Sequence, residues 1–63
     1  MRTKYLITMY QDLGNQMVQI NSFINFEDNS ETELEALLRV YDACKNLQET
    51  VSLALINLIH PVS

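Results

Sequence analysis

The strongest constraint on this fold is the spacing of apolar residues around a single interruption, the segment 27–30. Before it, apolar residues recur at alternating intervals of four and three: Leu6, Tyr10, Leu13, Met17, Ile20 and Ile24. This is the period of one face of an α-helix, whereas a half-buried strand would alternate every second residue. The pattern therefore predicts a helix over about residues 3–25 and a turn over about 26–30.

The second segment carries its own start and stop signals. Ser30 and Glu33 form the pattern of a capping box, in which the hydroxyl accepts from the third backbone N–H and the glutamate returns to the N–H of the cap residue. Pro61 disfavours helical backbone at the residue before it. We therefore expect a helix over about residues 31–60.

The second helix is apolar over a wide arc. One row of residues is spaced by three and four, and its members up to Val51 are expected to lie opposite the first helix: Leu37, Val40, Cys44, Leu47, Val51, Ala54 and Leu58. A second row runs beside it: Leu34, Tyr41, Gln48 and Leu55. Gln48, a member of the second row, and Asn46, close to it, are candidates to specify helix register, as a buried amide does in coiled coils. Gly14, in the first helix, indicates a close approach of another helix, with a kink as the alternative reading.

Length and composition favour assembly. The 63 residues form one domain, 1–63, and a domain of this size is marginally stable unless a disulfide, a metal or a partner supports it. One cysteine provides no internal disulfide, and one cysteine with one histidine cannot complete a structural zinc site. Two helices joined by a short turn fold back on each other. The sequence thus predicts an all-α fold, an antiparallel two-helix hairpin that dimerises into a four-helix bundle.

The end of the second helix is the predicted oligomer interface. A turn near Asp28 sets residue i opposite about residue 57 − i, so residues 53–59 extend past the start of the first helix. Apolar side chains point nearly all round this overhang, and a second copy would cover them. The expected interface residues are Val51, Leu55, Ile56, Leu58 and Ile59.

Nothing in the sequence suggests catalysis, a cofactor or a metal. Cys44 is interpreted as a small core residue, because the histidine lies sixteen residues, roughly 24 Å, along the same helix. His60 itself is interpreted as a helix-terminal cap. The acidic residues near the turn, in a chain of net charge −4, have two readings, helix capping with solubility and a docking point for a basic protein partner. The candidate docking residues are Glu27, Asp28, Glu31 and Glu35.

The leading functional hypothesis is a small non-catalytic regulator, inhibitor or adaptor, of phage or plasmid type, that acts through protein–protein contacts. The alternatives are a nucleic-acid-binding dimer that uses Arg2 and Lys4, or a structural subunit of a larger complex. The negative net charge disfavours nucleic acid over most of the surface. No run of apolar residues is long enough to span a membrane, and we expect a cytoplasmic protein.

In layout alone, the predicted chain resembles the repressor of primer family, whose helical hairpins dimerise into a four-helix bundle that holds a pair of RNAs. The likeness covers the arrangement of the whole chain and no residue motif. The RNA-facing helix of that family carries lysines, whereas here the corresponding bases, Arg2 and Lys4, stand at the very start of the helix. No functional residue is carried over from the family.

Overall fold

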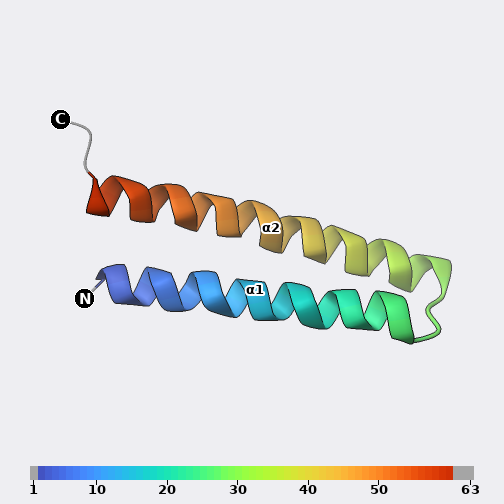
Figure 1. The fold of residues 1–63 in the computed structure, drawn as a ribbon. Helices are drawn as coiled ribbons and strands as arrows, with labels where there is room; N and C mark the ends of the chain where they lie inside the picture. Colours follow the sequence, from blue (N-terminus) through green and yellow to red (C-terminus); the bar gives the residue numbers. More distant parts are fainter. Residues whose placement is uncertain (1, 61–63) are drawn as a thin grey trace.

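The computed structural model describes residues 2–60, which form two helices, α1 over Arg2–Phe26 and α2 over Glu31–Ile59. The helices run antiparallel, with the start of α1 and the end of α2 at one end of the molecule and the turn at the other (Figure 1). The predicted all-α hairpin is confirmed, and its helices begin and end within one residue of the expected positions. Pro61, the predicted stop signal, and Met1 lie outside the described residues.

The start of α2 is capped by Ser30. Its backbone is extended, with φ −68° and ψ 163°, and its Oγ accepts from the backbone N–H of Glu33 at 3.2 Å. The Ser30 hydroxyl in turn donates to Oε1 of Glu33 at 3.0 Å. The capping residue is the predicted one, but the glutamate accepts the hydroxyl proton of Ser30, where the expected partner was the backbone N–H. Both side chains are thereby used to hold the first turn of α2.

Asn29 caps the end of α1, which the sequence analysis did not predict. Its Nδ2 donates to the backbone carbonyl of Phe23 at 2.9 Å and to that of Glu27 at 3.1 Å. The last carbonyls of a helix lack partners within the helix, so this amide satisfies one of them. At the end of α2, the backbone N–H of His60 donates to the carbonyl of Ile56 at 2.7 Å.

The face of α1 that packs on α2 is the predicted one. Ile20 is buried, with 7% of its surface exposed, and Tyr10 is the most exposed member of the row. The remaining members are half-buried: Leu6, Leu13, Met17 and Ile24. The four-and-three spacing therefore identified the correct face of this helix.

The face of α2 that packs on α1 differs from the predicted one. Val40 and Leu47 were expected to face α1 but are 51% and 47% exposed. The observed row takes alternate members from the two sequence rows: Leu34, Leu37, Tyr41, Cys44, Gln48, Val51 and Leu55. This inner row is also spaced by three and four, and it shares Leu37, Cys44 and Val51 with the predicted row. The helix is rotated so that the row containing Gln48 turns inward.

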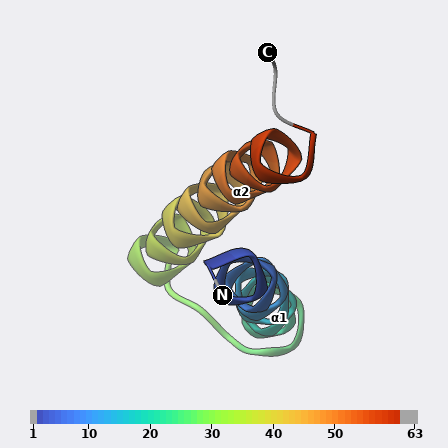
Figure 2. The same cartoon turned by 90° about the vertical axis from the view of Figure 1, so that its left-hand side faces the viewer.

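The molecule is long and thin, with extents of 49 × 17 × 13 Å and a radius of gyration of 14.7 Å. A compact domain of this length has a radius of gyration of about 11 Å. Viewed along its length in Figure 2, α2 runs obliquely across α1. Val51 is buried and Leu55 is half-buried, so α1 covers α2 farther toward its end than the predicted overhang from residue 53 allowed.

Candidate interaction surface

A polar contact joins the two helices. Nε2 of Gln48 donates to the backbone carbonyl of Tyr10 at 3.2 Å, across the helix–helix contact. Gly14 lies beside this amide, because a Cβ at Gly14 would come within 3.2 Å of Nε2. The close neighbour predicted for the glycine is thus a side chain of α2. The pairing of Tyr10 with Gln48 lies within one residue of the predicted register, which placed residue 47 opposite Tyr10.

The rotation of α2 leaves an apolar row on its outer surface. We call this row the outer stripe, and it consists of Ala36, Val40, Ala43, Leu47, Ala54 and Leu58. Its members recur with helical spacing, and all are exposed except Ala54, which is half-buried. The stripe stretches over most of α2, and it lies about a quarter turn around the helix from the inner row.

On one side of the hairpin, the outer stripe of α2 lies next to α1. A shallow groove near the turn has walls from both helices and is lined by Phe23, Glu27, Asn29, Glu33, Ala36 and Leu37. Ala36 is the first residue of the outer stripe, so Phe23 marks the side of α1 that adjoins it. Seven-residue spacing continues this side of α1 from Phe23 through Gln16 and Met9 to Arg2.

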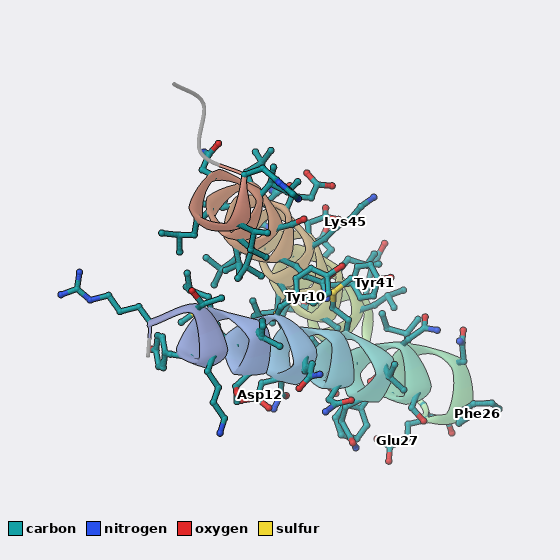
Figure 3. All side chains as sticks on the ribbon, turned by 60° about the vertical axis from the view of Figure 1, so that its left-hand side comes forward. Tyr10, Asp12, Phe26, Glu27, Tyr41 and Lys45 are labelled. Atoms are coloured by element: carbon teal, nitrogen blue, oxygen red, sulfur yellow. The ribbon has the colours of Figure 1, made fainter. Side chains whose placement is uncertain are left out.

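The other side of the hairpin is more polar. A second groove there is lined by Tyr10, Gln48, Glu49, Ser52 and Leu53. Lys45 extends from α2 into solvent in Figure 3, and Leu38 is exposed. The two sides of the hairpin therefore differ: the outer stripe has an apolar surface, and the opposite side mixes apolar and charged residues.

The structure places the predicted interface residues in three different environments. Val51 is only 4% exposed and belongs to the core of the hairpin itself, so little of its surface is left for a second copy. Leu55 is half-buried against α1. Ile56, Leu58 and Ile59 are exposed, and of these Leu58 belongs to the outer stripe. Val40 and Leu47 were predicted to face α1, and their place on the outer surface was therefore not predicted.

The ends of the hairpin carry opposite charges. The four predicted docking residues, Glu27, Asp28, Glu31 and Glu35, are exposed at the turn end, which we call the acidic tip. Figure 3 shows Phe26 and Glu27 pointing away from the hairpin at this end. Arg2 and Lys4 are exposed at the opposite end. The two ends of the molecule therefore differ in charge: the turn end is negative, and the start of α1 is positive.

The cysteine and the histidine of the chain lie at different places in the hairpin. Cys44 lies half-buried in the inner row, and His60 is exposed at the end of α2. Within residues 2–60, no three histidine, cysteine, aspartate or glutamate side chains are grouped as metal ligands would be. Neither helix of this part of the chain is long and apolar enough to cross a membrane.

Comparison with known proteins found no family model, no curated protein and no solved structure that matches the chain.

Proposed function

We propose that this protein is a non-catalytic interaction module that assembles with a second copy into a four-helix bundle and acts through protein–protein contacts. The observation that carries the proposal is the distribution of apolar side chains. Among residues 2–60, twelve large hydrophobic side chains are exposed, whereas only Ile20 and Val51 are buried hydrophobic residues. Such a hairpin has too small a core to be stable alone.

The accessible surface is large enough for one interface of standard size with a partner. The chain exposes 5246 Å², whereas a compact protein of 7.3 kDa exposes about 4,200 Å². The excess is roughly 1,000 Å² per chain, and a standard interface removes about 800 Å² from each partner. One interface of ordinary size would therefore bring the exposed surface into the range of a compact protein.

In this proposal the dimer is the scaffold of a regulator, inhibitor or adaptor, and the acidic tips project from it. Residues Ser30 and Glu33 are occupied in capping α2, and Asn29 caps α1. The four carboxylates of the acidic tip remain exposed to solvent. A basic protein surface is the partner whose charge complements them.

Sedimentation equilibrium over a range of protein concentrations, with circular dichroism on the same samples, tests the assembly. We expect a helical particle of twice the 7.3 kDa chain mass at micromolar concentration. Helicity and dimerisation should be lost together on dilution, because a marginal hairpin loses its support with its partner. A fully helical monomer at tens of micromolar would contradict the proposal.

A further inference from the structure

We propose that two copies pair through the outer stripe of α2, with the two α2 helices antiparallel around a two-fold axis at Leu47. The inference rests on the proposed function, since it names the face and the orientation through which self-assembly takes place. It differs from the sequence-based expectation, which placed the contact at the end of α2. The outer stripe of one copy thus packs against the outer stripe of the other.

The order of residues in the outer stripe suits pairing with itself. In an antiparallel pair centred on Leu47, residues equally far before and after that position lie opposite each other. Val40 and Ala54 are each seven residues from Leu47, and Ala36 and Leu58 are each eleven residues from it. Ala36 and Ala54 therefore each face a large side chain of the other copy, whereas Ala43 lies opposite Val51, which is buried in its own hairpin. Large and small residues that alternate across a contact interdigitate without voids.

Most charged side chains of α2 lie on the side of the helix away from this contact. Between residues 36 and 58 the charged residues are Arg39, Asp42, Lys45 and Glu49. Helical geometry places Asp42, Lys45 and Glu49 on the far side of α2 from Leu47, while Arg39 flanks the stripe. Burying the stripe against another copy would therefore desolvate apolar side chains with little cost in buried charge.

The charges at the two ends of the hairpin favour the antiparallel orientation. A parallel pair would bring two acidic tips together, and like charges in close contact are unfavourable. An antiparallel pair separates the tips by about the length of α2, roughly 43 Å for 29 residues. It also brings the acidic tip of each copy toward the end that carries Arg2 and Lys4 in the other. The side of α1 that adjoins the stripe has Arg2 at one end and Glu27 at the other.

A matched pair of leucines tests the face. Leu47 and Leu38 lie on opposite sides of α2 and are 47% and 48% exposed in the hairpin. Leu47→Glu should raise the dimer dissociation constant by on the order of 100-fold or more, because it sets two carboxylates against each other in an apolar contact. Leu38→Glu should change the dissociation constant by less than about 5-fold, as expected for a surface substitution. Sedimentation equilibrium measures both.

Spin-label distances test the orientation without disturbing the contact. In a Cys44→Ala background, one nitroxide is attached at Thr32→Cys, fifteen residues from Leu47. The antiparallel pair places the two labels roughly 45 Å apart, whereas a parallel pair places them within about 20 Å. A label at Asn46→Cys, next to the axis, should give a short distance in either case and reports that the dimer is present.

The outcomes separate this inference from the proposed function. If both glutamate variants dissociate equally, or if Thr32 labels lie close together, the protein is a dimer but the outer stripe or the antiparallel orientation is wrong. If the unsubstituted protein is a helical monomer, the proposed function fails and this inference fails with it. If Leu47→Glu loses both helicity and dimer while Leu38→Glu keeps both, the inference is supported, because Leu47 is already exposed in the single hairpin.

Discussion

Replacing Gly14 with alanine should reveal an energetic coupling between the glycine and the amide of Gln48. An alanine inside an exposed helix is more stable than a glycine by about 1 kcal/mol, because glycine loses more backbone entropy on folding. At Gly14, however, the added Cβ would lie 3.2 Å from Nε2 of Gln48, closer than ordinary van der Waals contact. The amide has to move, and its hydrogen bond to the Tyr10 carbonyl is already 3.2 Å long.

The two contributions have similar magnitudes and opposite signs. Losing the hydrogen bond costs about 0.5–1.5 kcal/mol, and the freed amide can turn into the groove beside Ser52 and regain water. Gly14→Ala should therefore change the free energy of unfolding by less than about 0.5 kcal/mol in the natural sequence. In a Gln48→Ala background the amide is absent, and the same substitution should stabilise by the full ~1 kcal/mol.

Urea denaturation followed by circular dichroism measures all four proteins of this double-mutant cycle. Each must be studied at the same protein concentration, because the stability of the proposed dimer would depend on it. The expected coupling is about 0.5–1.5 kcal/mol. An equal gain from Gly14→Ala in both backgrounds, within the ~0.3 kcal/mol accuracy of additivity, would refute the reasoning. It would show that Gly14 makes no room for Gln48.

Three further predictions concern the turn end. Ser30→Ala should lower the free energy of unfolding by about 0.5–2 kcal/mol in the same urea assay, since the first turn of α2 loses its cap, and an unchanged midpoint would contradict this role. Asn29→Ala should cost about 0.5–1.5 kcal/mol and speed amide hydrogen exchange in the last turn of α1, whereas unchanged exchange there would show that the cap contributes nothing. The double variant Glu31→Gln, Glu35→Gln should keep its thermal midpoint but bind an oligolysine probe more weakly at low salt, with the difference fading as salt is added. Equal binding by both proteins would leave the acidic tip with a solubility role only.

Local signals in the sequence were sufficient to determine the two helices and the hairpin. The capping pattern of Ser30 and Glu33 located the start of α2, because a cap depends on residues within one turn. The row from Leu6 to Ile24 identified the inner face of α1, since that helix has one apolar row opposite a polar side. The cap at Asn29 was missed because an asparagine in a turn has several local partners, and only the path of the turn selects one of them.

The tertiary structure alone decided which face of α2 is inside. Two overlapping rows share Leu37, Cys44 and Val51, so periodicity was equally satisfied by turning Leu47 or Gln48 toward α1. Hydrophobicity favoured Leu47, but Gln48 finds a carbonyl acceptor and a gap at Gly14, thirty-four residues away in sequence. The spacing of apolar residues predicts which side chains share a face of the helix. Which of two apolar faces meets the other helix depends on contacts between residues distant in sequence, and the face left outside is the one available to a partner.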